Sequence, residues 1–152
     1  MTTAAQVLDA YIVYYESLSP DRIGRLRDLA AENLHFRDPF NDIHGRHLVE
    51  EMLHDMFAKL KLVKFTMLEK YLNETSAALL WRFTAQMPRG RNTKMEFEGM
   101  SRIAFGTDGK IISHLDYWDA ASGVYENIPL LGACLRLLKR RMSADAAGSI
   151  RK

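Results

Sequence analysis

The sequence predicts a single α+β domain in which helices pack on a curved antiparallel sheet. Before Leu62 the apolar residues recur at helical spacing, and from Leu62 to Trp118 they alternate with a period of two. Strand-like runs flank the Asp108-Gly109 pair, which indicates a hairpin because glycine adopts the positive φ of a tight turn freely. At 152 residues the chain is long enough for one domain with a substantial core and too short for two ordinary ones.

The composition is that of a soluble globular protein, with 47% hydrophobic and 26% charged residues. A net charge of +2, concentrated near the C-terminus, argues against nucleic acid as a partner. The single cysteine, Cys134, excludes an internal disulfide framework. The N-terminal residues carry no basic segment of the kind that opens a signal peptide. We therefore expect a cytoplasmic protein.

The first part of the chain predicts three helices and one short strand. A helix over 4–18 is indicated by the spacing of its apolar residues, and Ser-Pro-Asp at its end starts a second helix that runs to about residue 31. Residues 34–38 alternate as a short strand with Asp38 facing inward. After a loop, an apolar stripe predicts a third helix over roughly 46–60.

Four antiparallel strands follow the third helix. The first begins at Leu62, the second runs over 77–85, and the last two form the hairpin within 94–119. A C-terminal helix is predicted within 124–141, where leucines form one row. The domain is expected to span 1–142.

Two expectations concern the C-terminal part of the chain. We expect residues 143–152 to form a flexible tail. We expect the C-terminal helix to fold back near the mouth of a pocket or a dimer edge, because its leucine row needs an apolar partner. Docking on a membrane surface is the competing interpretation, since three basic residues, 139–141, end the helix; we regard membrane contact as the less favoured of the two.

The last strand carries the residues that point to function. A period of two places one set on the inner face and the other set on the outer face. The inner set is Ile112, His114, Asp116 and Trp118, and the outer set is Ile111, Ser113, Leu115 and Tyr117. Two ionisable groups are expensive to bury without a purpose, so the inner set predicts a pocket wall. The outer set is apolar enough to predict a homodimer built on the outer face of the sheet.

The element order and three motifs resemble the nuclear transport factor two superfamily, which includes ketosteroid isomerase, SnoaL-like polyketide cyclases, limonene epoxide hydrolase and scytalone dehydratase. RDPF at 37–40 resembles the Asp-Pro motif of ketosteroid isomerases, and Tyr14 stands where those enzymes keep a tyrosine. IAFGTDGKIISHLDYWD at 103–119 is similar to the last hairpin, with the His-x-Asp pattern of the SnoaL-like branch. Over residues 4–119 the resemblance implies a cystatin-like cone, with three N-terminal helices on a curved antiparallel sheet.

The resemblance also implies a set of site residues. Asp38 or Asp116 would take the proton, His114 would assist, and Tyr14 would bind a substrate carbonyl. The walls and substrate-binding positions would be Phe36, Trp81, Ser101, Ile103 and Trp118. Two carboxylates in one apolar space cannot both ionise cheaply, so one of them should have a raised pKa. Ser101 departs from ketosteroid isomerase, where a protonated aspartate supplies an oxyanion partner, and this departure argues against steroid isomerisation itself.

Each site residue has a second interpretation that does not involve catalysis. Asp38 is equally explained as a residue that caps an Asp-Pro turn. Tyr14 is also explained as a core tyrosine. His114 and Asp116 need not touch, and buried water or the first helix would satisfy them.

We therefore predict a cofactor-independent acid/base enzyme, of isomerase, cyclase or dehydratase type, acting on a small apolar oxygenated molecule in a conical pocket. The alternative is a non-catalytic ligand-binding or dimerisation domain of the same fold; a transport adaptor has less support. We predict no metal site, because His35 should point away from the pocket and the other histidines, His44, His47 and His54, lie in or beside a loop and helix.

Overall fold

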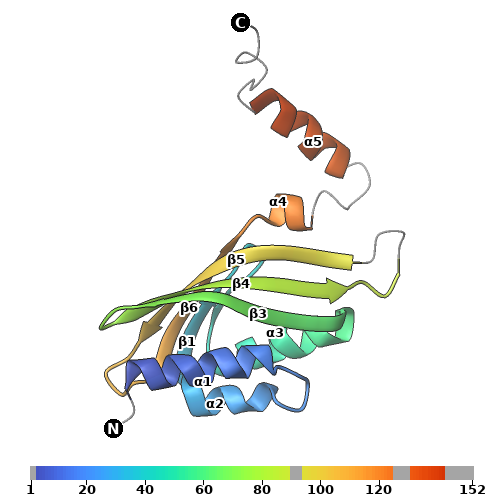
Figure 1. Ribbon diagram of the computed structural model, residues 1–152. Helices are drawn as coiled ribbons and strands as arrows, with labels where there is room; N and C mark the ends of the chain where they lie inside the picture. Colours follow the sequence, from blue (N-terminus) through green and yellow to red (C-terminus); the bar gives the residue numbers. More distant parts are fainter. Residues whose placement is uncertain (1–2, 90–93, 125–130, 143–152) are drawn as a thin grey trace, which may run out of the picture. The chain divides into compact units, whose positions relative to one another are not determined.

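The computed structural model describes residues 3–89, 94–124 and 131–142. The chain divides into two compact units, Met1–Trp118 and Asp119–Lys152. The first unit holds the sheet and the first three α-helices (Figure 1). Among the described residues no helix is both long and apolar enough to cross a membrane.

The elements of the first unit follow the predicted order closely. The helices are α1 (Ala4–Glu16), the 3₁₀ turn η1 (Ile23–Arg25), α2 (Leu26–Leu29) and α3 (Arg46–Lys59). The strands are β1 (Ala30–Arg37), β2 (Asp42–His44), β3 (Lys61–Leu72), β4 (Ser76–Gln86), β5 (Lys94–Phe105) and β6 (Ile111–Trp118).

The strands form one curved sheet in the order β2-β1-β6-β5-β4-β3. All neighbours pair antiparallel except β1 and β6, which pair parallel and place the early strand beside the last one. Helices α1, α2 and α3 lie on one side of the sheet (Figure 1). The predicted α+β class with helices on a curved sheet is confirmed.

The core lies between the helices and the inner face of the sheet. In β4 every second residue is buried, as the period of two predicts: Ala77, Leu79, Trp81, Phe83 and Ala85. Helix α1 begins with a capping box, in which Thr3 and Gln6 satisfy each other's backbone N–H groups. This cap fixes the start of the helix whose tyrosines enter the core.

The prediction for the second helix was wrong in its extent. The chain forms only η1 and the short α2, and it is already a strand at Ala30. Ala30 and Ala31 favour a helix intrinsically, but Ala30 pairs with Ile111 of β6, and tertiary pairing overrides a weak local preference. The region predicted to be a loop after Pro39 also contains β2, which pairs with the end of β1.

From Ser113 onward the residues of β6 lie on the predicted faces of the sheet, but Ile111 and Ile112 do not. The register between β5 and β6 shifts between Ala104 and Phe105, so one residue is left over at the start of β6. As a result Ile111 is fully buried and Ile112 is exposed, the reverse of the prediction. Ile111 therefore belongs to the core rather than to the outer face.

The second unit contains two described helices, α4 (Ala120–Gly123) and α5 (Leu131–Met142). Asp119 caps α4 by accepting a hydrogen bond from the Ser122 N–H. The C-terminal helix is present as α5, and residues 125–130 of the predicted range lie outside the described residues. Its docking near a pocket mouth or dimer edge stays a prediction, and the predicted tail over 143–152 lies outside the described residues.

Candidate active site

Five polar side chains from four elements are hydrogen-bonded to one another between the sheet and α1. They are Tyr11 from α1, Trp81 from β4, Ser101 from β5, and His114 and Asp116 from β6. We call this group the inner network. Four of its members were predicted as site residues, and Tyr11 was not.

Strand pairing explains why these side chains meet. His114 and Asp116 are two residues apart on β6 and therefore share a face. Ser101 stands directly opposite Asp116 in the pairing of β5 with β6. Directly opposite residues in an antiparallel pair have close Cβ atoms, so a serine there reaches the carboxylate.

The network runs without a break from α1 to Asp116. The Tyr11 hydroxyl lies 2.7 Å from Nδ1 of His114, and Nε2 of His114 lies 2.6 Å from Oδ1 of Asp116. Nε2 is also 3.1 Å from the Ser101 hydroxyl. Ser101 donates to the same Asp116 oxygen, and it accepts a 2.7 Å hydrogen bond from the indole N–H of Trp81. The carboxylate oxygen Oδ1 is thereby held by two donors.

The two oxygens of Asp116 have different surroundings. Among the described residues Oδ1 accepts from Ser101 and His114, whereas Oδ2 has no hydrogen-bond partner. Oδ2 is not sealed off, since the only buried unpartnered side-chain N or O atom in the described part of the chain is the Tyr15 hydroxyl. The Asp116 side chain is 15% exposed and that of His114 is 5% exposed. Asp116 is therefore a carboxylate fixed on its inner side and accessible on the other.

The hydrogen bonds of the network place a proton on Nε2 of His114, since the Asp116 carboxylate oxygen beside it accepts. Burial raises the pKa of Tyr11 far above its ordinary value, so its hydroxyl keeps its proton at neutral pH. That hydroxyl donates to Nδ1, which leaves the Nε2–H to donate to Asp116. Every group in the chain of hydrogen bonds then has a matching partner.

Tyr15 carries a buried donor without a partner. Its hydroxyl is close enough to Tyr11 for the two to affect each other's pKa, yet it forms no hydrogen bond of normal geometry with any described residue. Burial, chiefly, and the nearby Asp116 charge raise the pKa of Tyr15 well above its ordinary value. An unpaired buried hydroxyl is costly, so a bound molecule or water is expected to take this position.

The carboxylate of Asp38 is hydrogen-bonded within its own loop. Its Oδ1 accepts 2.7 Å hydrogen bonds from the N–H groups of Phe40 and Asn41, and the Asn41 side-chain amide contacts both carboxylate oxygens. No contact in the described part of the chain joins Asp38 to His114 or Asp116. This is the loop-capping arrangement that the alternative interpretation predicts.

The hydroxyl of Tyr14 already has a hydrogen-bond partner within the protein. It donates a 2.9 Å hydrogen bond to the backbone oxygen of Ile23, and the Tyr14 side chain is buried. The donor that the resemblance assigned to a substrate carbonyl is thus already in use. Tyr11, one helical turn earlier, and Tyr15, the next residue, are the tyrosines whose rings contact His114. The sequence signal for these contacts with His114 was the presence of three tyrosines within one turn of α1.

Aromatic and aliphatic side chains pack around the inner network. The Phe36 ring is centred 5.1 Å from that of His114, and Ile103, which is fully buried, pairs with His114 across the sheet. Trp118 stacks on Phe97 at 4.4 Å. Such walls exclude water and strengthen hydrogen bonds inside.

Gly99 makes room for Trp81. A Cβ atom at Gly99 would lie 2.4 Å from the Trp81 ring and 3.0 Å from Cβ of Trp118. Real side chains do not approach so closely, so only glycine allows the indole to lie across β5 at this point. That position brings the indole N–H to Ser101.

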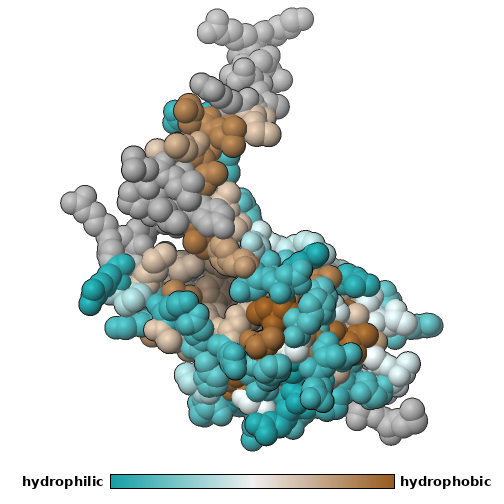
Figure 2. All heavy atoms as spheres, turned by 180° about the vertical axis from the view of Figure 1, so that it is seen from behind, coloured by the Kyte–Doolittle hydropathy of each residue, from teal (hydrophilic) through white to brown (hydrophobic). Residues whose placement is uncertain are grey.

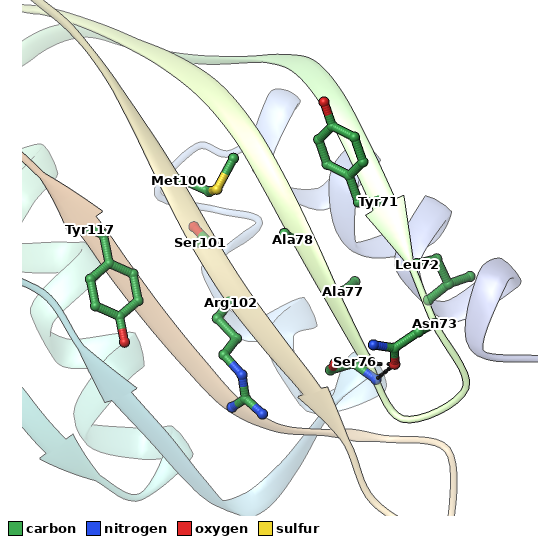
Figure 3. A pocket seen from close by; sticks show the side chains of 10 residues that line it. All are labelled: Tyr71, Leu72, Asn73, Ser76, Ala77, Ala78, Met100, Ser101, Arg102 and Tyr117. Carbon is green, nitrogen blue, oxygen red and sulfur yellow. Dashed lines mark hydrogen bonds between the residues drawn. The ribbon is translucent and has the colours of Figure 1, made fainter.

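The outer face of the sheet carries an open hollow. Figure 3 shows Tyr71, Met100, Arg102 and Tyr117 around a floor that includes Ala78. Met100 is 40% exposed, Tyr117 53% and Tyr71 54%. In the face of the molecule that Figure 2 draws, hydrophobic side chains also gather in patches between hydrophilic ones. Apolar surface is thus left uncovered outside the core.

Three further polar side chains meet at the edge of the sheet, where β1 pairs with β2. His35, Asp42 and His44 place one ligand-type atom each within 4.8 Å of one another. We call these three residues the edge cluster. Sequence reasoning missed it because β2 was predicted to be a loop; once β2 exists, His35 and His44 are partners in its register.

The chain matches the family model of the SnoaL-like domain over residues 13–114. A comparison with curated proteins finds no match in sequence.

Solved structures share the fold at low sequence identity. An LEH-like epoxide hydrolase from M. tuberculosis has a TM-score of 0.64 at 11% identity, over 93% of this chain and 95% of that one. A SnoaL-like polyketide cyclase from Agrobacterium tumefaciens has a TM-score of 0.62 at 18% identity, over 78% and 93%. A protein with a ketosteroid isomerase-like fold from Catenulispora acidiphila, solved with trimethylamine, has a TM-score of 0.66 at 14% identity, over 80% and 91%.

Proposed function

Because the chain belongs to the family of SnoaL-like domains, we propose that it is a cofactor-independent acid/base enzyme of isomerase or cyclase type. Its substrate would be a small apolar molecule that carries a carbonyl or a related oxygen function. The observation that carries this proposal is the Asp116 carboxylate, fixed through Oδ1 by two donors and accessible through Oδ2. The fold alone does not identify the activity, since one fold hosts many activities.

Asp116 is the group best placed to accept a proton from carbon. A base works when it is oriented toward the reacting atom and holds its protonation state until contact. Ser101 and His114 supply the orientation, and Oδ2 is the atom that would take the proton. We assign this role to Asp116 rather than to Asp38, whose carboxylate is engaged by its own loop.

The Tyr15 hydroxyl is the donor that we propose for the substrate oxygen. It is buried, protonated at neutral pH, and has no hydrogen-bond partner among the described residues. When Asp116 removes a proton next to a carbonyl, negative charge develops on the carbonyl oxygen, and a hydrogen bond there lowers the barrier. The proton then returns to a different carbon, or the enolate carbon attacks an electrophile in the same molecule.

His114 acts in this scheme as a positioning residue. It joins Asp116 to Tyr11, so the carboxylate is tied to α1 as well as to its own sheet. The Nε2–H of the imidazole also stabilises the carboxylate by hydrogen bonding. No cofactor is needed for these steps.

Hydrogen–deuterium exchange tests the proposal without knowledge of the natural substrate. A panel of aromatic and cyclic β-diketones in D₂O would be followed by NMR at the carbon next to the carbonyl. We expect the protein to accelerate exchange for some members, and Asp116→Asn to slow it by roughly 10²–10⁴-fold, the usual contribution of a general base. Tyr15→Phe should slow exchange less, with its fold retained.

Two control variants make the result specific. Glu98→Gln removes a carboxylate from an exposed ion pair with Arg82 and should leave exchange unchanged. If Asp38→Asn rather than Asp116→Asn abolishes exchange, the base is assigned to the wrong residue. If diketones bind with no exchange in any variant, the chain is the non-catalytic binding domain of the alternative interpretation.

We also propose that the chain forms a homodimer through the outer face of its sheet. The exposed apolar side chains of Met100, Tyr71 and Tyr117 around the hollow support it, because a monomer would leave them in water. Sedimentation should give twice the chain mass of 17.4 kDa. Met100→Lys should weaken association, while Leu62→Lys, at an exposed apolar position outside the hollow, should not. A cytoplasmic location remains a prediction.

A further inference from the structure

The edge cluster brings together two imidazoles and one carboxylate on adjacent strands. His35 in β1 and His44 in β2 stand opposite each other in the antiparallel register, and their rings stack with centroids 4.1 Å apart and planes at 6°. Asp42, two residues before His44, shares its face of β2. Three side chains that commonly ligate metals therefore converge on one point of the surface.

The distances suit a shared ion with only small side-chain movement. Nε2 of His35 lies 2.7 Å from Oδ1 of Asp42, Nε2 of His44 lies 3.9 Å from the same oxygen, and the three ligand atoms lie within 4.8 Å of one another. Ligands of a tetrahedral Zn²⁺ ion are about 3.3 Å apart, given metal–ligand bonds of about 2.0–2.1 Å. Asp42 and His44 side chains are 62% and 73% exposed, so both can adjust by rotation.

From this geometry we propose that His35, Asp42 and His44 bind a divalent transition-metal ion. Imidazole nitrogen favours Zn²⁺, Ni²⁺ and Cu²⁺, whereas Mg²⁺ and Ca²⁺ prefer sites built from oxygen alone. Three protein ligands leave a position for water or for a further ligand. The Arg37 guanidinium, which is the nearest cation on β1, is turned toward Tyr117, with 3.2 Å between its nitrogen and the tyrosine hydroxyl.

The proposed metal site is separate from the inner network. His35 and Phe36 are consecutive residues of β1 and therefore face opposite sides of the sheet; Phe36 is buried beside His114. An ion at the edge cluster would join the three-residue edge strand β2 to β1 by a bond that the backbone pairing alone does not supply. A bound ion should therefore stabilise the β1–β2 edge of the sheet and leave the inner network unchanged.

Calorimetric titration of the full chain with Zn²⁺, without any polyhistidine tag, tests the proposal. We expect one ion per chain, and at least about tenfold weaker binding in His44→Ala and in Asp42→Asn, since loss of one ligand removes a metal bond. Mg²⁺ should produce no comparable heat. Circular dichroism should show the same fold in each variant, because His44 and Asp42 are exposed.

Two matched controls separate this site from adventitious binding. His54→Ala removes an exposed histidine of α3, and Cys134→Ser removes the exposed thiol, and neither should change the affinity or the stoichiometry. Wild-type affinity in His44→Ala, loss of binding in either control, or no binding by the wild type at millimolar Zn²⁺ would each overturn the proposal.

Discussion

In the described part of the chain, the two closest histidine–aspartate pairs have nearly the same separation and very different surroundings. His114 and Asp116 are 2.6 Å apart, and His35 and Asp42 are 2.7 Å apart. The first pair has side chains that are 5% and 15% exposed, and the second has side chains that are 30% and 62% exposed. Distance alone therefore does not distinguish a site suited to proton transfer from one suited to an ion.

Burial and additional partners explain the difference. The inner pair is joined by Tyr11 and Ser101, so both ring nitrogens of His114 and Oδ1 of Asp116 are oriented, and both side chains are largely buried. The edge pair lies beside the exposed His44 and opposite Arg37 in the strand register, and its exposed atoms can rotate to meet a solute. Electrostatic interactions weaken with solvent exposure, so the inner pair should affect stability and chemistry much more than the edge pair does.

The largest expected effect is alkaline unfolding driven by the inner tyrosines. Burial raises the pKa of Tyr11, Tyr14 and Tyr15 above their ordinary value of 10.0. A raised pKa in the folded state means that this stability is fully present below the unfolded value and is lost as the pH rises through and beyond 10.0. Phenolate absorbance of these tyrosines should appear only together with loss of the circular dichroism signal. Their ionisation in the intact fold would show that the inner face is open to water.

The next largest effect should follow removal of the inner histidine. His114→Leu leaves the Tyr11 hydroxyl without its His114 partner and removes one of the two donors to Asp116. We expect a loss of about 2–4 kcal/mol in the free energy of unfolding, since each buried unsatisfied polar group costs about 1–3 kcal/mol. Urea denaturation followed by circular dichroism measures it. His54→Leu, the same substitution on an exposed position of α3, should change stability by at most about 0.5 kcal/mol.

The inner region was also the more predictable of the two. The period of two placed His114, Asp116 and Trp118 on one face, and the buried alternation of β4 follows directly from the sequence. Tyr11 was missed because choosing among three tyrosines on one helix turn depends on where α1 lies against the sheet. The register shift near Phe105, which reversed the environments of Ile111 and Ile112, is likewise set by strand pairing and not by local pattern.

The structure of the sheet edge formed by β1 and β2 was predicted poorly, and the reason is physical. β2 is three residues long and half exposed, so it has no apolar periodicity of its own and depends on β1 for its hydrogen bonds. The parallel pairing of β1 with β6 is also a long-range contact that no local signal announces. Asp38 shows the same limit, because an Asp-Pro motif is equally compatible with a catalytic base and a loop cap until its hydrogen bonds are known.

An intermediate effect on the free energy of unfolding is expected at Gly99, which lies against the Trp81 ring of the inner network. Gly99→Ala would drive its Cβ atom into the Trp81 ring and displace the indole from Ser101. Overpacking of this kind costs about 1–3 kcal/mol, and tryptophan fluorescence should report the displacement. Gly24→Ala is the matched control, because the only side chain near an added Cβ atom there is the flexible end of Arg27. Equal losses in the two variants would mean that the indole position is not decisive.

The smallest effect should come from the edge pair, measured with the metal chelated. His35→Ala removes a hydrogen bond between side chains that are 30% and 62% exposed, and water replaces it on both sides. Exposed ion pairs contribute about 0–1 kcal/mol, so we expect the free energy of unfolding to change by no more than about 0.5 kcal/mol. The same measurement with Zn²⁺ should separate the wild type from His35→Ala, because an ion that binds only the folded chain stabilises it. A loss in chelator as large as that of His114→Leu would show that the edge pair is structural, and the contrast between the two pairs would then not depend on burial.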